Sequence, residues 1–176
     1  EYSVFNEDVM KFVYILSSEK IDQKNINKLL NDSKVVIILD TINDHGMPEQ
    51  RKMFVDFIIN ECKTPIVISR YYKNSNYEDI CINSSIDIGA LLLDGLGDGI
   101  LISSKNICNV KKINELSFGI LQGARTRVSK TEFISCPSCG RTQFDLQEIT
   151  ALIRSKTQHL KGLKIGIMGC IVNGPG

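Results

Sequence analysis

The first two thirds of the chain alternate between continuous apolar runs and amphipathic segments. Three short runs have little polar interruption, which is typical of strands buried on both faces of a parallel sheet: Val35–Leu39, Pro65–Ser69 and Gly99–Ile102. The segments that follow them repeat apolar residues every three or four positions and predict helices: residues 48–62, 77–94 and 110–124. This alternation predicts an α/β fold with a parallel sheet, either open or closed into a TIM-barrel-like form.

The N-terminal segments are less clearly patterned. Residues 5–17 are rich in apolar side chains and suit either a helix or a strand, and we favour a helix. Ile21–Asn31 places Ile26, Leu29 and Leu30 on one face, which predicts a short amphipathic helix.

A polar, basic stretch, Arg125–Thr131, interrupts the alternation and predicts a boundary between residues 1–130 and 131–176. Beyond it the pattern predicts a strand at Glu132–Ser135 and a second strand at Leu163–Met168. Between them we expect a helix that begins at Thr142, with Asp145 completing a capping-box-like pair. The second part is therefore expected to be a small α+β unit.

Composition narrows the function classes. The 176 residues carry a formal net charge of +1 and are 43% hydrophobic, which is typical of a soluble globular protein and gives no reason to expect a nucleic-acid or membrane partner. Six cysteines are too sparse for a disulfide scaffold in a chain of this length. Cys62, Cys81 and Cys108 lie in or beside regular elements, so we interpret them as ordinary apolar residues.

The other three cysteines lie in loops that contain glycine and proline. Cys136 and Cys139 share the stretch Cys136-Pro137-Ser138-Cys139-Gly140-Arg141-Thr142, and Cys170 lies in Met168–Gly176. About thirty residues separate the two loops, enough for a helix and a strand that return the chain to the same end of a domain. The spacing therefore predicts that three thiols converge.

Three kinds of site suit such thiols. A structural zinc site would need a fourth ligand, from His45, His159 or a carboxylate, since neither histidine lies in a cysteine loop. A thioredoxin-like pair of Cys136 and Cys139 would leave Cys170 without a role. An iron–sulfur cluster fits best, because its thiolate ligands come from loops whose backbone approaches the sulfurs closely, and three thiolates leave one iron for a weaker ligand.

The two cysteine motifs, Ile134–Thr142 and Ile167–Gly176, resemble those of the 4-hydroxy-3-methylbut-2-en-1-yl diphosphate synthase family. Gly89–Gly99 and Leu121–Arg125 also resemble the family, in particular its large plant and apicomplexan-type form. That form has an extra barrel-like domain between its substrate-binding barrel and its cluster domain. The resemblance implies that residues 1–130 are the latter part of the extra domain and that 131–176 begin the cluster domain.

The resemblance also implies an activity. The family opens the ring of 2-C-methyl-D-erythritol 2,4-cyclodiphosphate reductively in the methylerythritol phosphate pathway of isoprenoid biosynthesis. A 4Fe-4S cluster carries the electrons, from a ferredoxin or a flavodoxin-type donor. The cluster ligands correspond to Cys136, Cys139 and Cys170, and Asn173 corresponds to an asparagine beside the substrate. Arg141, next to the first cysteine loop, is a candidate for attracting the diphosphate. A plastid location and a homodimer in the full-length protein are further expectations.

The sequence departs from the family in two ways. The family's fourth cluster ligand is a glutamate directly after the Asn-Gly-Pro-Gly turn, and this chain stops at Gly176. Nothing before Val35 resembles the substrate-binding barrel, so we expect the chain alone to be inactive. Asp40, Arg70 and Asp98 are placed at predicted strand ends, where barrel enzymes keep their chemistry, and the sequence leaves their roles open.

Overall fold

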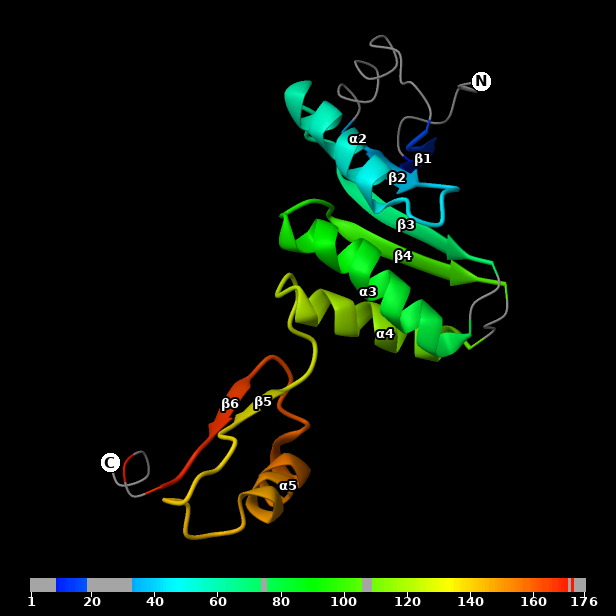
Figure 1. Ribbon diagram of the computed structural model, residues 1–176. Coiled ribbons are helices and arrows are strands. Elements are labelled where there is room, and N and C mark those ends of the chain that lie inside the picture. The colour runs from blue at the N-terminus through cyan, green and yellow to red at the C-terminus, as the bar shows by residue number, and fades with distance from the viewer. Residues whose placement is uncertain (1–8, 19–32, 74–75, 106–108, 171, 173–176) are drawn as a thin grey trace. The chain divides into compact units, whose positions relative to one another are not determined.

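The computed structural model describes residues 9–18, 33–73, 76–105, 109–170 and 172. The chain forms two compact units, Glu1–Ala124 and Arg125–Gly176, called unit 1 and unit 2 below (Figure 1). The division falls at the start of the basic stretch noted in the sequence. Among the described residues, no helix has the length and apolar character that crossing a membrane requires.

Unit 1 is built on a parallel sheet of four described strands in the order β1-β2-β3-β4. Helices α2 and α3 connect β2 to β3 and β3 to β4, and α4 follows β4. The element bounds are β1 Lys11–Leu16, β2 Val35–Asp40, α2 Met47–Ile59, β3 Ile66–Tyr72, α3 Tyr77–Leu93, β4 Gly99–Ser104 and α4 Val110–Gly123. The predicted α/β class and parallel sheet are confirmed. The order of the strands follows the chain, as in a barrel, but the described strands form an open sheet.

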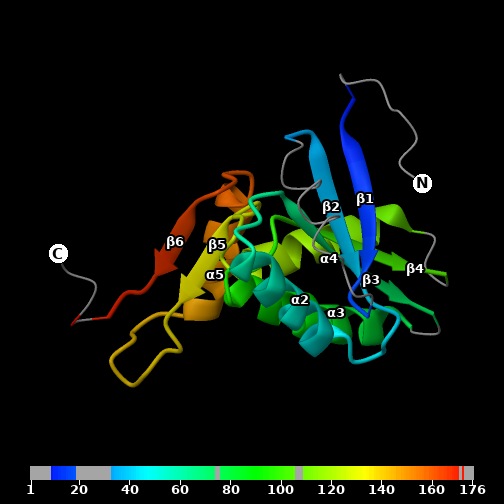
Figure 2. The ribbon, with the colours of Figure 1, turned by 90° about the horizontal axis from the view of Figure 1, so that it is seen from above.

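The helix expected in residues 5–17 is wrong where the structure describes it, because residues 11–16 form strand β1. This strand pairs with β2 along its whole length, from Lys11 beside Val35 to Leu16 beside Asp40, and the two lie side by side in Figure 2. Aromatic and β-branched residues favour a strand once a partner is available, and local periodicity does not contain that partner. The helix predicted at Ile21–Asn31 lies outside the described residues.

The core of unit 1 lies between one face of the sheet and the helices. Its fully buried strand residues are Val35, Ile37, Leu39 and Ile68, and they belong to one cluster with Phe57 of α2 and Leu91 of α3. Each such side chain contributes about 1.5–3 kcal/mol by leaving water. The opposite face of the sheet is more open, since Phe12 and Tyr14 of β1 are 63% and 57% exposed.

Asp98 lies at the amino end of β4 rather than at the edge where barrel enzymes keep their chemistry. Its carboxylate accepts a hydrogen bond from the Ile66 N–H at 2.8 Å, and its own N–H donates to the Ile66 carbonyl oxygen at 2.7 Å. Asp98 thus fastens the start of β4 to the start of β3. The expectation that it sits with Asp40 and Arg70 at one functional edge is wrong, because the residue precedes its strand.

Unit 2 consists of β5 (Glu132–Ser135), α5 (Leu146–Thr157) and β6 (Lys164–Ile167). The two strands pair in parallel, from Glu132 beside Lys164 to Ser135 beside Ile167. The Thr131 hydroxyl donates to the Leu160 carbonyl oxygen at 2.6 Å and so ties the start of β5 to the chain that follows α5. The predicted β-loop-α-β order is confirmed.

We predict that Gly97→Ala destabilises the protein more than Gly95→Ala. Both glycines have positive φ, +77° at Gly95 and +87° at Gly97, so both alanines carry a backbone strain of about 1–2 kcal/mol. A Cβ at Gly97 would also lie 2.6 Å from Cδ1 of the buried Ile68, whereas one at Gly95 meets nothing within 4 Å. Denaturant unfolding should show an additional loss of roughly 1–3 kcal/mol for Gly97→Ala. Equal losses would mean that Ile68 moves aside without cost.

Candidate functional site

Both cysteine loops of unit 2 leave the same edge of its sheet. Cys136 directly follows β5, and Cys170 comes three residues after the end of β6. Because the strands are parallel and Ser135 pairs with Ile167, their carboxyl ends lie together. The Cys136 N–H donates to the Ile167 carbonyl oxygen at 3.0 Å, which extends the pairing into the first cysteine loop.

Cys139 lies in a turn that Thr142 closes. The Thr142 N–H donates to the Cys139 carbonyl oxygen at 2.9 Å, and the Cys139 N–H donates to the Thr142 hydroxyl oxygen at 3.4 Å. Ser138, just before Cys139, has a φ of +72°, a conformation that a non-glycine residue rarely adopts. Cys139 is exposed, whereas Cys136 and Cys170 are partly buried, and all three are free thiols.

The predicted helix cap is wrong in detail. The helix α5 begins at Leu146, and its N-cap is Asp145, whose Oδ1 accepts from the N–H groups of Gln147 at 2.8 Å and Glu148 at 3.0 Å. Thr142 is used in the cysteine turn instead. An aspartate at the N-cap satisfies the first free N–H groups of the helix directly, so the helix starts after the capping residue.

The described residues do not form a closed metal site. Among them, no group of three or more His, Cys, Asp or Glu side chains lies close enough to hold a metal ion. Asn173 lies outside the described residues. Arg141 is exposed in the first cysteine loop. The structure thus brings the loops of Cys136 and Cys170 to one edge but does not gather the three sulfurs.

A cavity of about 680 Å³ lies against the first cysteine loop. It is lined by Cys136 and Ser138 from the loop and by Thr150 and Arg154 from α5. The Thr150 hydroxyl oxygen is buried without a hydrogen-bond partner, and the Arg154 guanidinium lies 5.2 Å from the centre of the Phe133 ring. Sequence analysis did not single out Thr150 or Arg154. Their spacing of four residues, on the helix between the two cysteine loops, was the available signal.

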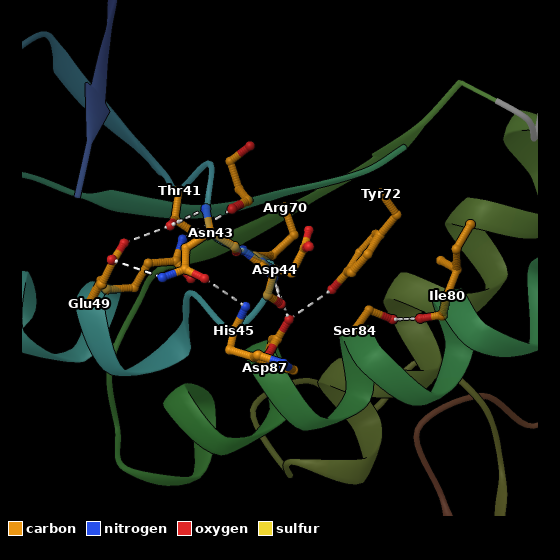
Figure 3. A network of polar contacts seen from close by, with 12 residues as sticks. Thr41, Asn43, Asp44, His45, Glu49, Arg70, Tyr72, Ile80, Ser84 and Asp87 are labelled. Atoms are coloured by element: carbon orange, nitrogen blue, oxygen red, sulfur yellow. Dashed lines mark hydrogen bonds and ion pairs between the residues drawn. The ribbon is translucent and has the colours of Figure 1, made fainter. Parts of the chain in front are cut away.

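In unit 1, Arg70 is the centre of a buried polar network (Figure 3). Arg70 is 2% exposed, and its Nε and Nη2 donate to Oδ2 of Asp87 at 3.0 Å and 2.8 Å. Nη1 donates to the Asn43 carbonyl oxygen and Nη2 to that of Asp44, both at 2.9 Å. The Tyr72 hydroxyl also donates to Asp87, and burial, followed by the nearby Asp87 charge, raises the pKa of Tyr72 above its ordinary value.

These contacts give Arg70 a structural role. Its charge is paired with Asp87, and its donors hold the loop between β2 and α2. Gly46 is required in that loop, because a Cβ there would lie 2.6 Å from the Arg70 Nη1 and 2.0 Å from Cγ2 of Thr41. Breaking a buried ion pair of this kind by removing one partner typically costs about 3–5 kcal/mol. Arg70 is therefore a clamp for the loop.

Glu49, in the first turn of α2, connects the helix to the ends of two strands. Its carboxylate accepts from the hydroxyls of Thr41 at 2.9 Å and Ser17 at 3.3 Å and from the Asn43 amide at 3.1 Å. Hydrogen bonds from Asn43 and then Thr41 hold the pKa of Glu49 below its usual range. Since these bonds favour the ionised carboxylate, Glu49 stabilises the fold as an anion.

Asp40 lies at the carboxyl end of β2, as the sequence predicted, and is 6% exposed. Its carboxylate accepts hydrogen bonds from the Tyr14 hydroxyl and from the Thr41 N–H. Desolvation of the Tyr14 hydroxyl, and then its hydrogen bond to Asp40, raise the pKa of Tyr14 to about 12. Asp40 and Tyr14 line a polar cavity of about 500 Å³ at this edge, together with Lys73.

Comparison with known proteins assigns the chain to a family. Residues 132–176, which contain all the cysteines of the two loops, match the GcpE protein C-terminal domain. Over 167 residues the chain is 44% identical to a protein of Parabacteroides distasonis named 4-hydroxy-3-methylbut-2-en-1-yl diphosphate synthase (flavodoxin). That alignment covers 95% of this chain and 27% of the relative. The chain belongs to this synthase family.

Two further relatives carry the same enzyme name. The Leptospira interrogans synthase (flavodoxin) is 56% identical over 148 residues, 78% of this chain and 22% of the relative. The chloroplastic synthase (ferredoxin) of Oryza sativa subsp. japonica is 48% identical over 127 residues, 72% of this chain and 17% of the relative. The chain thus spans about a quarter or less of the length of the relatives it matches, and the resemblance noted from the cysteine motifs is confirmed.

We predict that Glu49→Gln makes the stability of the protein less sensitive to acid. The pKa of Glu49 is lowered in the folded state, so its contribution is present above the unfolded-state pKa and is lost as the pH falls through the folded-state pKa. The variant should be less stable than wild type at pH 7, and its free energy of unfolding should fall less between pH 7 and pH 3. Glu61→Gln, which removes an exposed carboxylate after α2, is the control. Parallel pH profiles for wild type and Glu49→Gln would contradict the assignment.

Proposed function

We propose that this chain carries the cluster-binding part of a 4-hydroxy-3-methylbut-2-en-1-yl diphosphate synthase. In this proposal Cys136, Cys139 and Cys170 hold a 4Fe-4S cluster. The observation that carries it is the parallel pairing of β5 with β6, which directs both cysteine loops to one edge, within the segment that matches the family's C-terminal domain. The segment from 131 is the start of the cluster domain, and residues 1–130 are the latter part of the inserted barrel-like domain.

The residues present suit an iron–sulfur cluster. Three free thiols are soft ligands, and their loops carry glycine and proline residues that let backbone approach a cluster closely. The relatives' names include an electron-carrier protein, which supports a redox centre and gives no support to the alternative of a structural zinc module.

The proposed reaction is the reductive ring opening and dehydration of 2-C-methyl-D-erythritol 2,4-cyclodiphosphate to 4-hydroxy-3-methylbut-2-enyl diphosphate. When bound, the cluster supplies the two electrons of this reduction one at a time. The protein's own residues bind and orient. Arg141, exposed beside Cys139, would attract the diphosphate, and Asn173 would lie beside the substrate. The bond from the Cys136 N–H to Ile167 fixes where the first loop begins.

The proposed electron donor is a small one-electron carrier protein, a flavodoxin or a ferredoxin. The bacterial relatives described above are named with flavodoxin and the rice relative with ferredoxin. The rice relative is also named chloroplastic, which supports a plastid location, as the resemblance implied. A homodimer of the full-length protein remains part of the proposal. A pull-down of the purified protein with each carrier distinguishes the two donors.

We expect Cys136→Ser, Cys139→Ser or Cys170→Ser to prevent stable assembly of the cluster. Each change replaces a soft thiolate by a hydroxyl that is a poor ligand for iron. After anaerobic reconstitution with iron and sulfide, wild type should be brown, with broad visible absorbance and bound iron, and each variant should lose most of both. Cys81→Ser, which alters a partly buried thiol in α3 of unit 1, is the matched control and should load normally. A colourless wild-type protein that binds zinc would support the alternative.

We further expect the 176-residue chain to show no turnover by itself, even when loaded. It spans 27% or less of the three relatives described. The measurement is product formation from the cyclic diphosphate with a chemical reductant, compared with a full-length family member under the same conditions. Comparable turnover by the chain would refute this part of the proposal.

A further inference from the structure

The formal charge of the chain is divided unequally between its two units. Unit 2 contains eight lysine and arginine residues against three aspartate and glutamate residues, which gives it a net charge of +5. Unit 1 contains thirteen against seventeen, which gives it a net charge of −4. The overall charge of +1 hides this difference. The unit that carries the cysteine loops therefore attracts anionic partners, whereas unit 1 repels them.

Basic residues of unit 2 gather where its sheet begins. Arg125 and Lys164 both pair with the Glu132 carboxylate, at 3.3 Å and 3.8 Å, and Lys164 lies beside Glu132 in the register of β5 and β6. Lys130 directly precedes, and Lys161 directly follows, the two residues that the 2.6 Å hydrogen bond at the start of β5 joins. We call these four cations, Arg125, Lys130, Lys161 and Lys164, the basic edge.

The basic edge remains accessible to a partner and keeps an excess of positive charge. The side chains of Arg125 and Lys164 are 60% and 49% exposed although both pair with Glu132, and Lys130 and Lys161 are also exposed. The other two carboxylates of unit 2 lie at the N-terminus of α5, which follows the first cysteine loop. The basic edge thus has one carboxylate for four cations.

Helix chemistry explains other positive charges of unit 2 but not the basic edge. Arg154 and Lys156 lie in the last turn of α5, where cations are stabilised by the helix dipole. The basic edge lies outside the helix, in β6 and in the segments before β5 and after α5. Arg125 also has a φ of +62°, which a non-glycine residue rarely adopts. A strained backbone that holds a paired cation in place favours a functional role for it.

We propose that the basic edge docks a small electron-carrier protein with an acidic surface. This inference rests on the proposed function, in which such a carrier is the electron donor. The donor proposed above, a flavodoxin or a ferredoxin, belongs to this class of protein. Opposite charges raise the rate at which two proteins meet and set their orientation. The acidic unit 1 repels the same carrier, so the encounter is directed to the unit that carries the cysteines.

The basic edge is close enough to the cysteine loops for such a complex to pass an electron. Strands β5 and β6 have four residues each, so they separate the basic edge from the loops by roughly 13 Å. Weak electron-transfer interfaces bury less than about 1,200 Å² in total, and half of that area is a disc roughly 28 Å across. A carrier that contacts the basic edge therefore also reaches the side of unit 2 where the cysteine loops begin.

The test is the affinity of an acidic flavodoxin for the 176-residue chain, measured by isothermal titration at about 20 mM and about 200 mM salt. Lys161→Glu/Lys164→Gln should bind flavodoxin about tenfold more weakly than wild type at the lower salt. Lys52→Glu/Lys111→Gln makes the same change of charge at exposed positions of unit 1, and this matched control should bind within about twofold of wild type. The higher salt should weaken wild type and bring the edge variant close to it, because screening removes the difference.

Glu132→Gln should have an effect of the opposite sign. It removes the carboxylate that Arg125 and Lys164 share, so flavodoxin should bind about threefold more tightly. A variant that only damaged the fold would bind more weakly, so a gain in affinity separates docking from unfolding. In the cluster-loaded protein, the rate of cluster reduction by reduced flavodoxin should follow these affinities. The rate with a small chemical reductant should be the same for every variant.

The outcomes distinguish this inference from the proposed function. If wild type loads the cluster but the edge variant and its control bind flavodoxin alike, the inference is wrong and the proposed function stands. If wild type loads no cluster under conditions that load a full-length family member, the proposed function is wrong, and the assignment of an electron carrier to the basic edge fails with it. A DNA duplex that binds the basic edge as tightly as flavodoxin would also overturn the inference. Opposite shifts in the edge variant and Glu132→Gln, absent from the control, support it.

Discussion

The parallel pairing of β5 with β6 is the constraint on which the cysteine site depends. Parallel strands require a crossover, and α5 provides it, so the chain leaves β5 through one cysteine loop and arrives at the other by way of β6. The bond between the Cys136 N–H and the Ile167 carbonyl oxygen fixes the register at the edge where both loops begin. A slip of one residue would turn the strand faces over and remove Ile167 from the core of unit 2.

The carboxyl edge of the parallel sheet in unit 1 has a structural role. There the carboxyl edge of the sheet is occupied by charged groups that bind one another, chiefly Arg70 with Asp87 and Glu49 with its hydroxyl and amide donors. Burying an arginine is costly unless every charge is compensated, and here the Asp87 carboxylate and two backbone carbonyls provide the compensation. This edge holds a loop in place, whereas the loops at the corresponding edge of unit 2 carry free thiols.

The predictions that failed concern residues whose type allows more than one role. Residues 11–16 were expected to be helical, and they form a strand because β2 offers a pairing partner along their whole length. Thr142 was expected to cap α5, and Asp145 does so because Thr142 closes the turn at Cys139. Asp98 was expected at the strand ends where barrel enzymes keep their chemistry, but it lies at the opposite edge of the sheet. There its carboxylate accepts a hydrogen bond from Ile66 and so links the amino ends of β3 and β4. For residues 11–16 and for Asp98, a contact distant in the sequence decided between two possible roles, whereas for Thr142 a contact three residues away did so.

The sequence by itself determined the elements whose patterns are strong and local. The apolar runs at β2, β3 and β4 predicted a parallel sheet because a strand covered on both faces has little room for polar side chains. The two cysteine motifs, with their glycine and proline residues, predicted the family, and the comparison with known proteins confirms it. Only the tertiary structure showed that Arg70 is buried and paired, and that Thr150 and Arg154 line one cavity with Cys136. Burial and lack of a partner are properties of the folded neighbourhood, which no local pattern encodes.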